Sequence, residues 1–278
     1  RNTLMSASPT NDTSYVYYTY RRAIDTISSK DDLEGNIVSI PGLVYEPLTQ
    51  YLTEVAEQRG DALAVIDIAG ANNYTPSYIT KYEDSDPDGS GITRATSVDT
   101  VVTQFKGRNL NTSYGATYFP WVQISDSRTG KILAVPPSVP AIGAMSYTDS
   151  VQAPWFAPAG FNRGGLSTGN AGVNVVNTVK KLNSADRDKL YLVSINPITS
   201  FPNEGIVIFG QKTLQALPSA LDRINVRRLM IYTKRGIEII SKGTLFEPNV
   251  QTTWNNFKDQ AEPFLADIKS RFGLEDYK

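Results

Sequence analysis

The segment from residue 37 to residue 68 constrains the fold most strongly, because it contains signals for a strand, a helix and a buried strand in immediate succession. Ile37–Ile40 is a short apolar strand candidate. Apolar positions at helical spacing follow at Leu48, Leu52 and Val55. Gly60 is suited to closing that helix. Residues 62–68 form a continuous apolar run, which is typical of a strand covered on both faces. This order predicts a βαβ unit.

The rest of the chain continues the alternation. We expect strands at 15–20, 114–124, 131–135, 190–195 and 205–209, and helices at 98–105, 137–145, 224–242 and 254–272. Residues 69–94 and 160–174 are rich in loop-forming residues. Pro263 should bend or restart the last helix. The predicted fold class is mixed α/β (α+β), with a mostly buried sheet flanked by helices.

Composition excludes several classes of chemistry. The 278 residues contain no Cys and no His, and the formal net charge is −1. Ser-His-Asp and Cys-His catalysis and Cys-based zinc sites are therefore excluded. No basic stripe predicts nucleic-acid binding, and no apolar run approaches the roughly 20 residues of a membrane span. We predict no catalytic residue, no metal and no cofactor.

Two glycine-containing motifs resemble ligand-binding loops only in part. Asp84–Gly89 has the opening of an EF-hand, but the loop's twelfth position, which needs a bidentate Glu, is Ala95. A solvated acidic turn is favoured, and a calcium-dependent adhesion module is a third functional alternative. Gly164–Gly169 has the glycine spacing of a P-loop, but Asn170 follows where Lys is needed.

Two aspartates leave a hydrolase open as the main alternative function. Asp67 ends the apolar run, and Asp149 precedes an aromatic, Pro-rich connector. A paired-carboxylate glycosidase-like or peptidase-like enzyme uses two such residues. A single Asp at a strand end more often caps the following turn or helix.

Arginine and tryptophan side chains are the remaining candidates. Arg223 and Arg227 share one face of the expected helix, and Arg228 lies about 100° further round. They form either a solvated face with intrachain carboxylate partners or an ion-paired contact with a neighbouring subunit. The tryptophans Trp121, Trp155 and Trp254 are predicted structural anchors, because their aromatic surroundings provide packing area without chemistry.

Eight short phrases occur in the order found in contractile tail sheath proteins, and the chain resembles that family from about residue 37 to residue 278. The phrases are Ala64-Val-Ile-Asp67, Tyr118-Phe-Pro-Trp121, Val135-Pro-Pro-Ser138, Trp155-Phe-Ala-Pro-Ala159, Ile195-Asn-Pro-Ile198, Gly210-Gln-Lys-Thr-Leu214, Asn225-Val-Arg-Arg228 and Phe246-Glu-Pro-Asn249 with Trp254. Each phrase alone is weak, but their shared order is specific.

The resemblance implies a mechanical role. Residues 37–278 would be the sheath core domain without its C-terminal arm, and residues 1–36 a strand-rich remnant of an adjoining outer domain. The implied partners are other sheath subunits, the tail tube protein, the baseplate and the tail terminator, in a phage tail assembled in the host cytoplasm. Without the arm, the chain alone is expected to be a monomer.

The C-terminal helix carries a charged ribbon opposite its apolar stripe, which is expected to face the core. Lys269 lies about 20° round from Lys258, and Glu262 about 40°. A solvated face would contribute little to stability. The resemblance implies the alternative that this ribbon contacts acidic groups on the inner tube.

Overall fold

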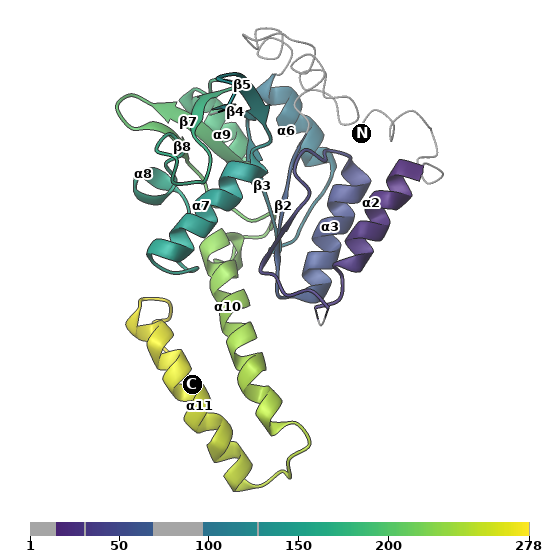
Figure 1. The fold of residues 1–278 in the computed structure, drawn as a ribbon, viewed down its shortest axis with the longest axis vertical. Coiled ribbons are helices and arrows are strands. Elements are labelled where there is room, and N and C mark those ends of the chain that lie inside the picture. The colour runs from purple at the N-terminus through teal and green to yellow at the C-terminus, as the bar shows by residue number, and fades with distance from the viewer. Residues whose placement is uncertain (1–14, 31, 69–96, 127, 278) are drawn as a thin grey trace.

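The computed structural model (Figure 1) describes residues 15–30, 32–68, 97–126 and 128–277. Its main sheet has five strands in the order β1-β2-β3-β7-β8. The strands are β1 (Ile37–Ser39), β2 (Leu63–Ile66), β3 (Gly115–Phe119), β7 (Asn196–Phe201) and β8 (Gly205–Ile208). The first four are parallel along the sheet, and β8 is antiparallel to β7. The predicted βαβ unit and the mixed α/β class are confirmed.

Helix α3 (Glu46–Arg59) connects β1 to β2 and ends where Gly60 predicts. Proline occupies its first turn, where no backbone N–H is needed. Gly60 ends the helix in the left-handed conformation, with φ of 68°, and its N–H donates to the Ala56 carbonyl at 3.0 Å. Leu48, Leu52 and Val55 are all buried, as their spacing predicts.

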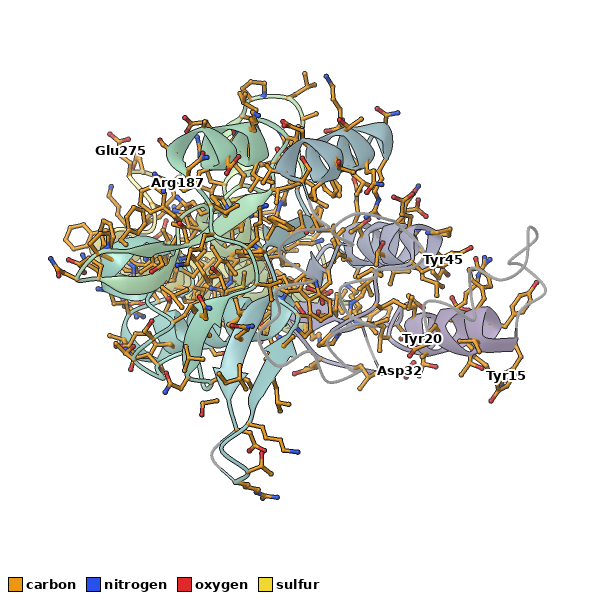
Figure 2. All side chains as sticks on the ribbon, turned by 90° about the horizontal axis from the view of Figure 1, so that it is seen from above. Tyr15, Tyr20, Asp32, Tyr45, Arg187 and Glu275 are labelled. Carbon is orange, nitrogen blue, oxygen red and sulfur yellow. The ribbon has the colours of Figure 1, made fainter. Side chains whose placement is uncertain are left out.

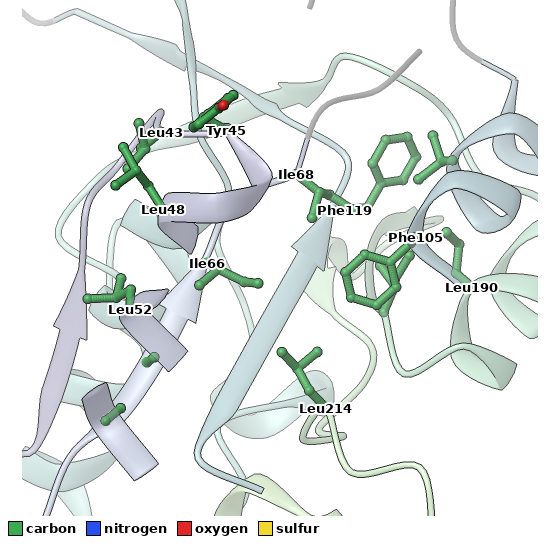
Figure 3. Close-up of a cluster of buried hydrophobic side chains, with 14 of the residues drawn as sticks. Leu43, Tyr45, Leu48, Leu52, Ile66, Ile68, Phe105, Phe119, Leu190 and Leu214 are labelled. Carbon is green, nitrogen blue, oxygen red and sulfur yellow. The ribbon is translucent and has the colours of Figure 1, made fainter. Parts of the chain in front are cut away.

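Strand β2 is buried on both faces, because alternate side chains enter different hydrophobic clusters. Ala64 and Ile66 join a cluster between the sheet and α3, with α6 (Val98–Gly107) and α9 (Ser184–Leu192) beside it (Figure 3). Leu63 and Val65 join a second cluster, with residues of α7 (Ser138–Val151). The period of two in a strand explains this division.

The strand expected over residues 114–124 is in fact two strands in different sheets. β3 ends at Phe119, and β4 (Val122–Ser125) lies between β5 (Ile132–Val135) and β6 (Val175–Thr178) in an antiparallel sheet. Pro120 follows a cis peptide bond and lacks the N–H that a continuing ladder requires. Trp121 then begins the new pairing, because its carbonyl accepts the Val179 N–H at 2.9 Å.

The strand expected at residues 15–20 is wrong, because this segment belongs to helix α2 (Tyr15–Thr26). Tyr17 and Ile24 are buried in the cluster around α3, and Val16, Tyr20 and Ile27 pack at its edge. This helical spacing outweighs the β-propensity of the aromatic residues. The boundary between residues 36 and 37 stays a prediction.

Two further expectations need correction. Residues 190–195 are not a strand, because α9 extends to Leu192; its capping box, Asn183 with Asp186, explains the start of the helix. Residues 160–174 are not simply a surface loop, since they include α8 (Gly160–Arg163) and the buried side chains of Leu166 and Ala171.

The C-terminal helices form a hairpin that extends away from the sheets (Figure 1). It consists of α10 (Ile224–Ser241) and α11 (Gln251–Ser270), joined through a short 3-10 turn at Lys242–Thr244. Helix α11 continues through Pro263 without restarting. A methyl group added at Gly236 would lie 2.2 Å from the Phe264 ring, so glycine permits this close approach of the helices.

Candidate interaction surfaces

Asp67 is buried at the C-terminal end of β2 and connects three parts of the core. Its Oδ2 accepts hydrogen bonds from the Gly42 N–H (2.8 Å) and the Ser138 hydroxyl (2.7 Å), and its Oδ1 from the Ser138 N–H (3.0 Å). Burial raises the pKa of Asp67 to about 6, although these hydrogen bonds act in the opposite direction. The contacts favour the capping alternative, since they hold the turn after β1 and the start of α7.

Asp149, the second carboxylate of the hydrolase alternative, forms an ion pair with Arg228. The Arg228 side chain is 3% exposed, so this ion pair is an internal contact between α7 and α10. Asp67 has its own, separate set of donors. The two carboxylates therefore each have a structural partner, and nothing brings them together as an acid–base pair.

Arg227 is also buried, beside Arg228 on α10. Its guanidinium lies 4.0 Å from the centre of the Tyr114 ring and donates to the Ser113 hydroxyl. Burial lowers the pKa of Arg227. The burial of Arg227 and Arg228 contradicts an exposed face, although Arg228 has the intrachain carboxylate partner that the first alternative expected.

Two of the three predicted tryptophan anchors are buried. Trp121 and Trp155 are each 5% exposed. The Trp155 indole N–H donates to the Arg271 carbonyl at 2.9 Å, and its ring meets Tyr232 edge-on at 5.5 Å. Trp254 is 55% exposed, and its N–H reaches the Asn249 side chain at 2.7 Å. The anchor role predicted for Trp254 is wrong.

The apolar stripe of α11 is divided between buried and exposed positions. Ala261 and Ile268 are buried, but Trp254 and Phe272 are exposed. The helix packs on α10 rather than on the sheet, so only part of the stripe is covered. The expectation that the whole stripe faces the core is wrong.

The charged ribbon of α11 is exposed and internally paired. The Lys258 ammonium lies 3.2 Å from Glu262, one helical turn away, and the Lys269 ammonium lies 3.0 Å from Asp276. The side chains of Lys258, Glu262 and Lys269 are 66%, 53% and 45% exposed. Such exposed pairs are weak, so partner charges can compete for these groups.

Of the two loop motifs, only the P-loop-like stretch lies within the described residues, and it does not form a phosphate-binding loop. Asp84–Gly89 lies outside the described residues. In the P-loop-like stretch, backbone groups of Gly164 and Leu166 pair with Ile208 and Ile206, and turns rather than a helix follow Gly169. No group of three or more His, Cys, Asp or Glu side chains in the described ranges is placed to hold a metal ion. Within the same ranges, no helix is long and apolar enough to cross a membrane.

The sequence reasoning missed one cavity, of about 530 Å³, between α8, α9 and β8. Its wall includes Arg187, Tyr191, Phe209 and Arg223. The capping box at Asn183 could have placed Arg187 and Tyr191 on one helix, but no pattern in the sequence brings them to Phe209.

Curated proteins similar to this chain are tail sheath proteins. That of Vibrio phage KVP40 is 36% identical over 170 residues, which cover 61% of this chain and 24% of the relative. The tail sheath protein of Enterobacteria phage T4 is 37% identical over 144 residues, which cover 52% of this chain and 21% of the relative. The tail sheath protein of Salmonella phage ViI is 28% identical over 280 residues, which cover 96% of this chain and 42% of the relative. The resemblance to contractile tail sheath proteins is confirmed. The chain spans less than half the length of these sheath proteins, and no protein-family model matches it.

Solved sheath structures share the fold. The sheath complex of the extracellular contractile injection system PVC, in its contracted state, superposes with a TM-score of 0.63 at 21% identity, over 92% of this chain and 61% of that one. A chain of the anti-feeding prophage baseplate in its contracted state superposes with a TM-score of 0.63 at 24% identity, over 92% of this chain and 62% of that one. At these identities the similarity establishes the fold alone.

Proposed function

We propose that this chain is part of a structural subunit of a contractile tail sheath. The subunit polymerises around the inner tail tube and contracts to drive the tube through the host envelope. The observation that carries the proposal is the sequence similarity to three phage tail sheath proteins, one of them aligned over 96% of this chain. The comparisons provide no support for the hydrolase alternative.

The structure of the core supports a mechanical role. A sheath subunit keeps its fold while its contacts with neighbours are exchanged. Two large hydrophobic clusters occupy opposite faces of the main sheet, and the Asp67 and Arg228 contacts connect them to the surrounding helices. Close-packed interiors of this kind transmit force with little deformation. We propose a non-enzymatic role on this basis.

The proposed partners are other sheath subunits, the baseplate, the tail tube protein and the tail terminator. The proposed location is the phage tail, assembled in the cytoplasm of the host bacterium. To test the function, the complete gene product that contains this chain is expressed in bacteria with the tube protein and viewed by negative stain. Tubular polymers that occur in a long and a short form support the proposal, and a dispersed protein contradicts it.

We propose that the α11 ribbon (Lys258, Glu262 and Lys269) faces the tube, and that Lys258 and Lys269 contact acidic groups there. The side chains are exposed on a hairpin that extends from the body, and their ion pairs are weak enough to exchange. In the complete gene product, K258E/K269E should preserve folding and reduce sheath assembly on tubes, most strongly at low salt.

The matched control is K106E/K131E, which changes the net charge by the same amount at exposed lysines of α6 and of the turn before β5. The control should assemble like the unmodified protein. Equal assembly by both variants across a salt series would mean that the ribbon is only a solvated face.

We also propose that the chain by itself is a monomer in dilute solution, since strand exchange between subunits requires a donated strand. Static light scattering checks this. Large assemblies whose size grows with concentration would contradict it.

A further inference from the structure

The cavity between α8, α9 and β8 has the composition of an interface hot spot. Its volume is about 530 Å³, within the roughly 300–1,000 Å³ of ligand pockets. An aromatic group of Phe161, Phe201 and Phe209 lies at this position, with ring centroids 5.0–6.0 Å apart. Phe161 is 50% exposed and Phe209 is 42% exposed. Aromatic residues and Arg are enriched where proteins bind each other.

Arg187 is the cation in this group that lacks an acidic partner. Its guanidinium lies 5.1 Å from the Phe201 ring centre and 5.7 Å from that of Phe209. In the part of the chain that the structure describes, no carboxylate forms an ion pair with Arg187. Arg223 differs, because it pairs with Asp222 at 3.1 Å and donates to the Tyr191 hydroxyl. Asp188 is the acidic residue in the wall.

The tip of the α10–α11 hairpin displays the complementary chemistry. Phe246 is fully exposed, at 103%, and its φ of 65° is uncommon for a bulky residue. Glu247 is exposed beside it, and it forms no ion pair among the described residues. The tip thus presents a ring and a carboxylate next to each other.

The tip and the cavity of one molecule are far apart. The hairpin tip is at one end of the long axis, and α8 and α9 are near the other (Figure 1). The view from above shows Arg187 on the side of the body away from Tyr15 and Tyr20 of α2 (Figure 2). A chain therefore cannot fill its own cavity with its own tip.

We propose that the hairpin tip of one copy of this chain inserts into the aromatic–arginine cavity of the next copy. The Glu247 carboxylate pairs with Arg187, and the Phe246 ring packs on the exposed rings of Phe161 and Phe209. The two surfaces differ, so the contact is heterologous and can repeat from copy to copy, which gives a ring where the rotation closes and a helical filament where it does not. The inference rests on the proposed function for its place in a sheath, but the contact can be tested without one.

Cysteine trapping provides the test, because the chain has no native Cys. We place one Cys in the cavity wall, D188C, and one at the tip, N249C, in the same chain. Under mild oxidation, insertion gives a ladder of disulfide-linked multimers, whereas either Cys alone gives dimers at most. Trapping captures a weak, transient contact, so the ladder is compatible with a monomer in light scattering. K131C with N249C is the control pair, since Lys131 is exposed and is not part of the cavity wall.

Charge reversal identifies the pairing. In the D188C/N249C background, E247R should reduce the ladder about tenfold, a change equivalent to roughly 1.4 kcal/mol. R187E should do the same, and the two together should restore it. E247R alters an exposed tip, so its effect cannot come from misfolding of the cavity.

A ladder of equal strength from the control pair, or one unaffected by either charge reversal, would overturn the inference. Tubular sheaths from a complete gene product whose paired cysteines do not cross-link would overturn this inference and leave the proposed function standing. A charge-dependent ladder from a complete gene product that never forms tubes would support this inference and contradict the proposed function.

Discussion

Replacing Trp155 by Ala should weaken the attachment of the C-terminal hairpin more than any change on its outer face. Trp155 lies in a small cluster with Ala153, Leu229 of α10 and Ile268 of α11. Its indole N–H also donates to the Arg271 carbonyl just after α11. The side chain therefore connects the connector after α7 to both helices of the hairpin.

The magnitude follows from burial. Trp155 is 5% exposed, and a buried aromatic side chain covers about 150–250 Å². At about 25 cal/mol per Å², this area contributes roughly 4–6 kcal/mol. Ala keeps part of that contribution, and the lost hydrogen bond adds about 1 kcal/mol. The expected loss is therefore about 3–5 kcal/mol, a large share of the stability of a typical domain.

Trp254→Ala is the matched control. It removes the same side chain from the same hairpin, but from a position that is 55% exposed, so about 1 kcal/mol or less is expected. Urea unfolding measures both variants, and amide hydrogen exchange locates the loss. In Trp155→Ala, protection should fall first in α11 and remain in β3. Equal unfolding free energies for the two variants, or unchanged exchange in α11, would refute the reasoning.

Three further outcomes follow from the core contacts. The pKa of Asp67 is raised to about 6 in the folded state, so the folded protein binds this proton more tightly than the unfolded chain does. The unfolding free energy should therefore fall by up to roughly 3 kcal/mol as pH rises from about 4 to 6. This slope should disappear in D67N. R228M leaves Asp149 unpaired and should cost about 3–5 kcal/mol in urea unfolding, whereas R228M/D149L should recover most of the loss. G236A pushes a methyl group against Phe264 and should destabilise the hairpin by about 1–3 kcal/mol in thermal melts, with F264A/G236A less affected than the sum of the single changes.

The parts of the fold that could be predicted are those in which local pattern and final packing agree. Helix α3 has three apolar residues on one face and glycine at its end, and both features have the predicted role. The predictions failed where packing against distant parts of the chain, rather than local propensity, determined the secondary structure. The aromatic run at Tyr15–Tyr20 favours a strand by propensity, but packing against α3 makes it a helix.

Site residues were harder to predict, because burial depends on contacts distant in sequence. The spacing of the arginines of α10 predicts an exposed patch, either solvated or in contact with a neighbouring subunit. Arg228 is buried, and its carboxylate partner Asp149 is 79 residues earlier in the chain. Arg187 and Phe209 reach the same cavity from a helix and from the end of a strand, and no spacing rule connects them.

The stripe of α11 shows why a pattern alone cannot assign a surface to a core. Apolar spacing indicates that a helix face becomes buried, but it does not say against what. Ile268 is covered by the chain itself, whereas Trp254 and Phe246 of the same hairpin are left to solvent. In the sheath polymer that we propose, a neighbouring molecule provides the missing cover. The exposed end of this stripe is therefore an argument for intermolecular contact, and it agrees with the tip-to-cavity pairing inferred from Arg187 and Glu247.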